Sequence, residues 1–225
     1  MPAAAPWNAN RVDTDYAHRL VLLRHAKSDW PDEMADVDRP LAKRGQRDAP
    51  VAGRWLARRA YIPDYVVCSA ARRARETWEL AGQALQAEVP GVPRPEVIFD
   101  DRVYEATVLS LLMLVREFPE AQRTILVVGH NPGLAELAVG LADPPPTPPA
   151  GLPTSSIAVL GLPGPWTDAA PVQGRLLDFA IPADMKSALR QAATAGGPAS
   201  RGTSNGAADA VMMPRPHPAT MTSWS

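Results

Sequence analysis

The chain has 225 residues, of which 46% are hydrophobic, so its length and composition allow one sizeable domain with a large core. The formal net charge of -1 disfavours nucleic acid and acidic membranes as partners, because no strong overall field attracts them. The single cysteine, Cys68, excludes an internal disulfide, and no signal-peptide-like or membrane-spanning apolar run is found, so we expect a cytoplasmic protein.

Short apolar runs alternate with helical patterns through the first two thirds of the chain. The first run, 20–23, is continuously apolar, which is typical of a strand that is buried on both faces. The later segments are predicted from the same periodicities and from turn signals between them. In chain order we expect a helix at 43–60, a strand at 65–68, a helix at 71–85, a strand at 97–99, a helix at 107–118, a strand at 124–129, a helix at 132–141 and strands at 157–160 and 176–181.

This alternation predicts an α/β fold: a single domain with a mostly parallel central sheet and helices on both faces. We place the domain at 18–185, after a flexible leader at 1–17. Beyond residue 185 the composition falls to Ala, Gly, Ser, Thr and Pro, so apart from a helical turn or two we expect a disordered tail over 186–225. The proline-dominated segment 143–153 is expected to be a polyproline-like loop.

Two helix starts depend on capping residues and prolines. Pro50 is acceptable if Asp48 is the N-cap, because proline is tolerated in the first turn, and awkward if the helix begins earlier. Asn131 is expected to cap the helix that follows, with Pro132 at its first position. His18 lies ahead of the first predicted strand, and we expect it at the surface.

Three of the predicted strands end in side chains that can do chemistry. Arg24 and His25 follow the first strand, Ser69 ends the second with Arg73 one turn further on, and His130 follows the strand at 124–129. If these strands are parallel, their carboxyl ends meet at one edge of the sheet, where ligands of open α/β sheets bind. We therefore expect these side chains to surround one ligand.

Two arginines and two histidines in one place fit a phosphoryl group. Arg24 and Arg73 can each bind phosphate oxygens in a bidentate way, and a neutral His25 can attack phosphorus. Neighbouring guanidinium groups disfavour the imidazolium form, and a protonated His130 could donate to a phosphoryl oxygen. Because the cations are side chains, no metal ion and no other cofactor is expected. Glu105, in a loop between a strand and a helix, is the candidate acid for the leaving group.

The chain resembles the histidine phosphatase superfamily of phosphoglycerate-mutase-like enzymes over about 20–181. Three motifs carry the resemblance: LLRHAKS at 22–28, SAARRARET at 69–77 and GHN at 129–131. The segment 28–45, with SDW, DRPL and RG, resembles the SixA-type branch of small phosphohistidine phosphatases. Ala26 replaces the glycine of the superfamily signature, a change that this branch shares.

The resemblance implies that His25 is phosphorylated during turnover and that Arg24, Arg73 and His130 hold the phosphoryl group. It implies a metal-independent phosphatase that acts on phosphohistidine in a protein. Imidazole leaves more easily than an alkoxide, so a weak acid or none would suffice for that substrate.

Three alternatives remain. The same site could serve a phosphomonoesterase that acts on small phosphate esters, or a non-catalytic module that binds a phosphoprotein. A nucleotide-binding doubly wound domain is disfavoured, because no glycine-rich turn follows the strand at 20–23.

Overall fold

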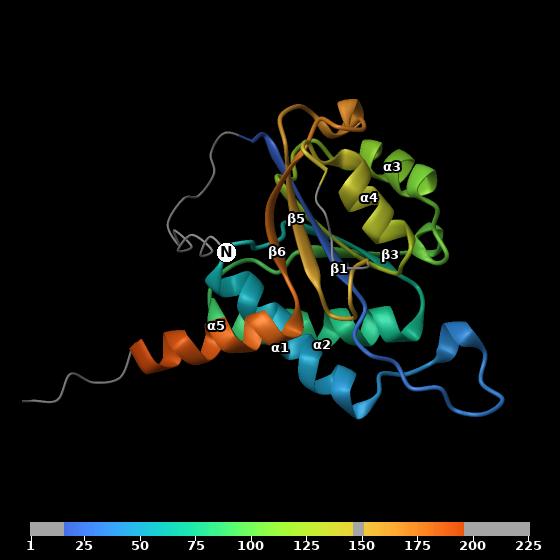
Figure 1. The fold of residues 1–225 in the computed structure, drawn as a ribbon, viewed down its shortest axis with the longest axis vertical. Coiled ribbons are helices and arrows are strands. Elements are labelled where there is room, and N and C mark those ends of the chain that lie inside the picture. Colours follow the sequence, from blue (N-terminus) through green and yellow to red (C-terminus); the bar gives the residue numbers. More distant parts are fainter. Residues whose placement is uncertain (1–15, 146–150, 196–225) are drawn as a thin grey trace, which may run out of the picture.

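The computed structural model describes residues 16–145 and 151–195 (Figure 1). The predicted leader and tail, and the centre of the proline-rich loop, therefore lie largely outside the described residues. In chain order the elements are β1 (His18–Arg24), η1 (Asp36–Asp38), α1 (Lys43–Arg58), β2 (Tyr65–Ser69), α2 (Arg72–Glu88), β3 (Glu96–Asp100), η2 (Asp101–Val103), α3 (Val108–Arg116), β4 (Thr124–Gly129), α4 (Gly133–Leu141), β5 (Ile157–Leu162), η3 (Trp166–Asp168), β6 (Arg175–Ala180) and α5 (Pro182–Ala195).

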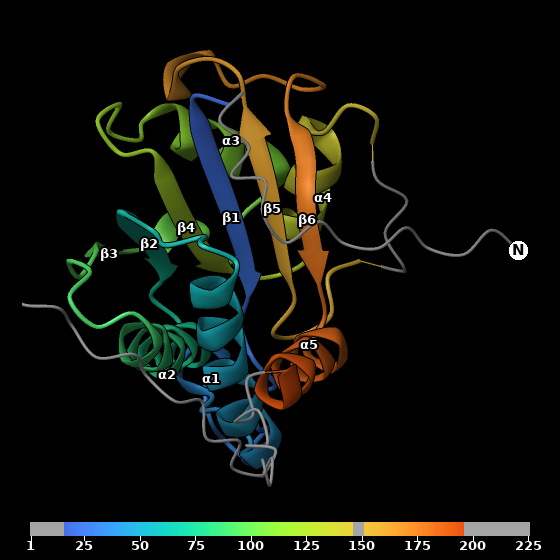
Figure 2. The same cartoon turned by 90° about the vertical axis from the view of Figure 1, so that its left-hand side faces the viewer.

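The strands form one six-stranded sheet in the order β3-β2-β4-β1-β5-β6. The first four strands in this order are mutually parallel, whereas β5 runs antiparallel to both β1 and β6. Four parallel neighbours bring the carboxyl ends of β1, β2 and β4 to the same edge of the sheet (Figure 2). The predicted α/β fold with a mostly parallel sheet is confirmed.

Helices cover both faces of the sheet, with α1, α2 and α5 on one side and α3 and α4 on the other (Figures 1 and 2). Successive side chains of β1 point to opposite faces of the sheet, so this strand contributes to the hydrophobic core on both sides. Leu20 and Leu22 belong to the core that includes α3 and α4, whereas Val21 and Leu23 belong to the core of α1, α2 and α5. All four are fully buried, as the continuously apolar run predicts.

Of the two starts that Pro50 left open for the first helix, the structure has the earlier one. α1 already begins at Lys43 and carries Pro50 in its interior, and the buried Asp48 carboxylate pairs with Arg44 and Lys186. The interior proline removes one backbone hydrogen bond. α1 packs closely on α2, since a Cβ on Gly53 would clash with the Ala81 carbonyl oxygen.

The last helix extends further than the composition of this segment suggests. α5 continues to Ala195, ten residues past the predicted boundary, so the prediction of disorder is wrong for 186–195. This helix buries Met185 against the α1 layer, and Lys186 bonds the Asp48 carboxylate at 2.5 Å. Tertiary contacts of this kind stabilise a helix whose local composition is unremarkable. None of the described helices is long and apolar enough to cross a membrane.

His18 is buried, contrary to the expectation of a surface residue. β1 begins at His18, two residues earlier than predicted, so this side chain belongs to the sheet. Its Nδ1 lies 3.0 Å from the Gly164 carbonyl oxygen, and its ring packs against Trp166 at 4.6 Å between centroids. Cys68 is fully buried as predicted, and burial raises the pKa of its thiol to about 12.

Candidate active site

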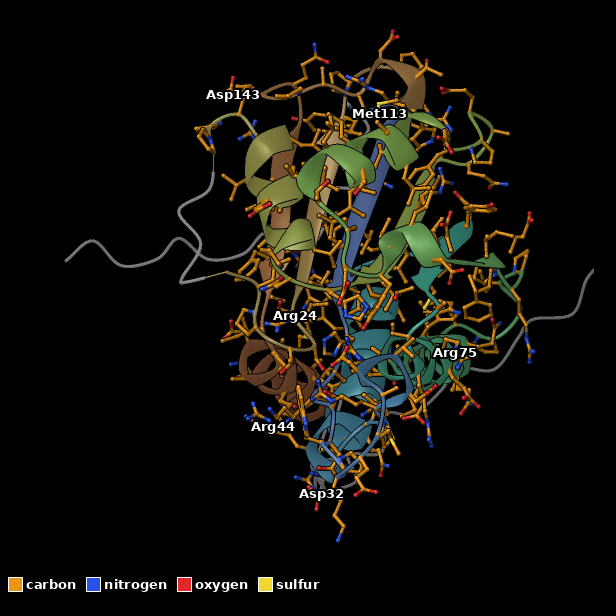
Figure 3. All side chains as sticks on the ribbon, turned by 90° about the vertical axis from the view of Figure 1, so that its right-hand side faces the viewer. Arg24, Asp32, Arg44, Arg75, Met113 and Asp143 are labelled. Atoms are coloured by element: carbon orange, nitrogen blue, oxygen red, sulfur yellow. The ribbon has the colours of Figure 1, made fainter. Side chains whose placement is uncertain are left out.

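The carboxyl ends of β1, β2 and β4 meet at a cavity of about 310 Å³. In the sheet register Arg24 lies opposite Gly129, so His25 and His130 each follow directly on neighbouring strands. Figure 3 shows Arg24 at the end of β1 away from Met113 of α3. The structure thus brings all five predicted site residues to one cavity. Its lining consists of Arg24, His25, Lys27, Ser28, Asp36, Arg39, Arg73, Tyr104, Glu105, His130, Asn131 and Thr154.

His25 is neutral, with its proton on Nδ1. Its Nδ1 lies 2.7 Å from the Ala26 carbonyl oxygen, which can only accept, so Nδ1 carries the proton and Nε2 keeps its lone pair. Burial, followed by the charges of Arg73 and Arg24, lowers the pKa of His25 to about 4, although the bond to Ala26 opposes the shift. The imidazole is therefore neutral at physiological pH.

His130 lies beside His25, with ring centroids 4.9 Å apart. Its Nε2 is 2.8 Å from Ser69 Oγ, which also accepts from the Ala71 backbone N–H. The Ser69 hydroxyl can either donate to Nε2 or accept from it, depending on the tautomer of the ring. Nδ1 has no partner within the described residues. Burial, with the nearby His25 and Arg73, lowers the pKa of His130 to about 3, so this ring is neutral and the protonated form that the sequence analysis considered is disfavoured.

The two arginines hold different positions in the site. Arg24 extends from the end of β1 and donates through a terminal nitrogen to the Leu152 carbonyl oxygen at 2.6 Å, while its Nε has no partner among the described residues. Arg73 lies in the first turn of α2 and is only 6% exposed. Its terminal nitrogens donate to the Asp36 backbone oxygen at 2.5 Å and to the Asp36 carboxylate at 2.8 Å.

Asp36, Arg39 and Tyr104 also line the cavity, and sequence reasoning did not select Asp36 or Tyr104. The Asp36 carboxylate accepts hydrogen bonds from Arg73, from Arg39 at 2.8 Å and from the Tyr104 hydroxyl at 2.7 Å. The 28–41 segment was expected to line a site because of its length and polarity. It contains several acidic residues, however, and no sequence signal distinguishes Asp36 from the others.

Mycobacterial relatives are similar over nearly their whole length. An uncharacterized protein of Mycobacterium tuberculosis is 40% identical over 169 residues, which cover 71% of this chain and 99% of that protein. The family model of the histidine phosphatase superfamily, branch 1, matches residues 20–97. This chain belongs to the histidine phosphatase superfamily.

Solved structures place it in the SixA-type branch of that superfamily. A protein assigned as the phosphohistidine phosphatase SixA of Nakamurella multipartitia is 31% identical, with a TM-score of 0.60 over 73% of this chain and 96% of that one. The protein histidine phosphatase SixA complexed with tungstate has the same fold, with a TM-score of 0.62 at 22% identity, over 74% of this chain and 99% of that one. Membership of this superfamily supports a hydrolase activity of the phosphatase class.

Two loop residues complete the site of this histidine phosphatase family member. Glu105 is exposed, lines the cavity and has a positive φ of 54°. Its role as the acid remains a prediction. Asn131 was expected to be a helix cap, but Pro132 occupies the N-cap of α4. The Asn131 amide instead donates to the Leu152 carbonyl oxygen at 2.9 Å, which fixes the same loop that Arg24 binds.

Proposed function

We propose that this protein is a metal-independent phosphohistidine phosphatase that works through a phosphorylated His25. Arg24, Arg73 and His130 would hold the transferred phosphoryl group, and the cations would be side chains rather than a metal ion. One observation carries the proposal most strongly: the Nδ1–H of His25 is fixed by the Ala26 carbonyl inside a cavity lined by arginines. This arrangement supports an unprotonated Nε2 as the attacking atom.

The protonation state of His25 suits a phosphohistidine substrate. His25 Nε2 attacks phosphorus, the bond between phosphorus and the substrate ring breaks, and the bonding pair leaves with the substrate imidazole. A substrate ring that is protonated on its other nitrogen leaves as neutral imidazole, and His25 becomes a phosphoimidazolium of the same charge. No proton has to move in this step, so no strong general acid is needed.

The second half of the reaction returns His25 to its starting state. Water attacks the phosphorus of phospho-His25, and the ring leaves as neutral imidazole with Nδ1–H still donated to Ala26. The water proton passes to the phosphate product or to solvent. Arg73 and Arg24, held beside the ring, stabilise the charge on the phosphoryl oxygens throughout.

The test is turnover of a phosphohistidine-bearing protein in the presence of a chelator, with wild-type enzyme and His25→Ala compared. We expect phosphate release by the wild type, loss of turnover in the variant and an unchanged circular dichroism spectrum. Acid quenching should destroy the trapped phosphoenzyme and alkali should preserve it, as for a phosphoramidate. Substantial turnover by His25→Ala would refute the nucleophile. Clearly faster hydrolysis of small phosphate esters than of phosphohistidine would instead favour a small-molecule phosphomonoesterase.

A further inference from the structure

A carboxylate lies in the same cavity as the cations that would hold the phosphoryl group. The Asp36 carboxylate is bonded by Arg73, Arg39 and the Tyr104 hydroxyl, so three donors fix its position. A guanidinium has five N–H donors, and the two bonds from Arg73 to Asp36 leave capacity for a phosphoryl oxygen. Asp36 can therefore stay in place beside a bound phosphoryl group.

Asp36 is more exposed to solvent than His25 and Arg73 are. His25 and Arg73 are buried, with 8% and 6% exposed, whereas the Asp36 side chain is 41% exposed. In-line displacement requires the leaving group to depart on the side of phosphorus opposite His25. The remainder of a protein substrate must also extend toward solvent. Asp36 therefore borders the solvent-facing part of the cavity, which is the part open to a protein substrate.

Asp36 is suited to accept a hydrogen bond rather than to donate a proton. The bonds from Arg39 and Tyr104, and then from Arg73, hold the pKa of the Asp36 carboxyl well below its usual range. The group is thus ionised wherever the enzyme works. An ionised carboxylate has about four lone-pair positions and three are engaged by the donors described, so one further N–H can be accepted.

We propose that Asp36 determines substrate specificity by accepting the N–H of a protonated leaving imidazole. The inference rests on the proposed function and extends it to the leaving group. In the transfer step the P–N bond breaks and its electron pair goes to the ring nitrogen. The proton on the other ring nitrogen stays there, facing Asp36, so neutral imidazole leaves. The same carboxylate repels a leaving group that departs as an anion, such as a phenolate or an alkoxide.

Two probes with the same phosphoryl group separate this role from a structural one. We would measure kcat/KM for N-phosphoimidazole and for p-nitrophenyl phosphate with the wild type, Asp36→Asn and Asp38→Asn. Asp38 is a matched control, since it lies in the same short helix, is exposed and is not part of the cavity lining. Asparagine keeps the shape of the side chain and removes its charge.

We expect Asp36→Asn to lower kcat/KM for N-phosphoimidazole by about tenfold or more, as for loss of one charge-assisted hydrogen bond. The value for p-nitrophenyl phosphate should stay level or rise, so the ratio of the two changes by at least about tenfold. Asp38→Asn should keep the ratio within about twofold of wild type, as for an exposed charge.

Equal losses on both probes would overturn the inference, because they would mean that Asp36 only positions Arg73 and Arg39. An equal gain on both would also overturn it, since the carboxylate would then merely compete for the phosphoryl site. Neither result touches the proposed function, which fails only if the wild type is inactive on phosphohistidine or if His25→Ala keeps its activity.

Discussion

Arg73→Met tests whether the buried guanidinium of α2 binds the transferred phosphoryl group. Arg73 is 6% exposed and is held on Asp36 by two hydrogen bonds of 2.5 and 2.8 Å, so its charge sits in a site from which water is largely excluded. Methionine keeps the apolar stem that packs in the first turn of α2 and removes every donor. The helix should therefore persist while the phosphoryl group loses a bidentate partner.

The expected cost follows from the number of bonds lost. A hydrogen bond that involves a charged group contributes about 1.5–3 kcal/mol, and a bidentate contact to phosphate makes two of them, or about 3–6 kcal/mol. Since about 1.4 kcal/mol corresponds to a factor of ten, kcat/KM should fall by roughly 10²- to 10⁴-fold. Asp36 keeps its bonds from Arg39 and Tyr104, which limits collapse of the loop.

The assay is phosphate release from N-phosphoimidazole and from p-nitrophenyl phosphate, because both present the same phosphoryl group. Arg72→Met is the matched control: Arg72 is the adjacent residue on α2, is exposed and pairs with Glu76 instead. It should lower kcat/KM by no more than about threefold. An Arg73→Met enzyme that folds and keeps kcat/KM within tenfold of the wild type on both probes would refute phosphoryl binding by Arg73.

Three further predictions concern the acid, the nucleophile and the last helix. If Glu105 is the acid, Glu105→Gln should slow alkyl phosphates far more than aryl phosphates or phosphohistidine, and equal losses would remove it from that role. Because the pKa of His25 is lowered from 6.5 to about 4, its ring should stay neutral as the pH falls through 6.5 and become protonated near pH 4. NMR titration of the labelled ring measures this pKa, and a midpoint near 6.5 would contradict the prediction. Lys186→Met should destabilise the fold by about 1–3 kcal/mol in urea unfolding, because among the described residues the buried Asp48 carboxylate then keeps only the exposed Arg44 as an ion-pair partner. An unchanged midpoint would show that the Asp48–Lys186 ion pair contributes nothing.

The sequence predicts the sheet because its strands are unusually apolar. The runs that contain Leu22, Val67 and Val127 have few residues that could lie in water, and turn signals separate them from amphipathic segments. Parallel pairing then places the residues that follow each strand at one edge, and this geometry brings His25, Arg73 and His130 together. Strand order itself has no local signal, since it depends on which faces pack and not on any one segment.

What the sequence did not predict depends on contacts between distant segments. Asp36 is one of several acidic residues in its loop, and only Arg73 on α2 and Tyr104 after β3 distinguish it. Asn131 has the side chain of a helix cap, yet Leu152 on a distant loop provides a different partner. Helix α5 has a composition typical of a tail and is held by Asp48 of α1.

The charges around the cavity explain how neutral imidazoles and an anion can share one site. Four cationic side chains and two carboxylates line it, so with both histidines neutral the lining carries two net positive charges. A dianionic phosphoryl group balances them without any proton being taken up. The positive charges that would attract a phosphoryl group also oppose protonation of His25, so the proposed nucleophile would stay neutral where the substrate binds. Burial is the larger cause of the lowered pKa of His25, and the arginine charges add to it, so removal of Arg73 or Arg24 should raise the pKa of His25 by part of the shift.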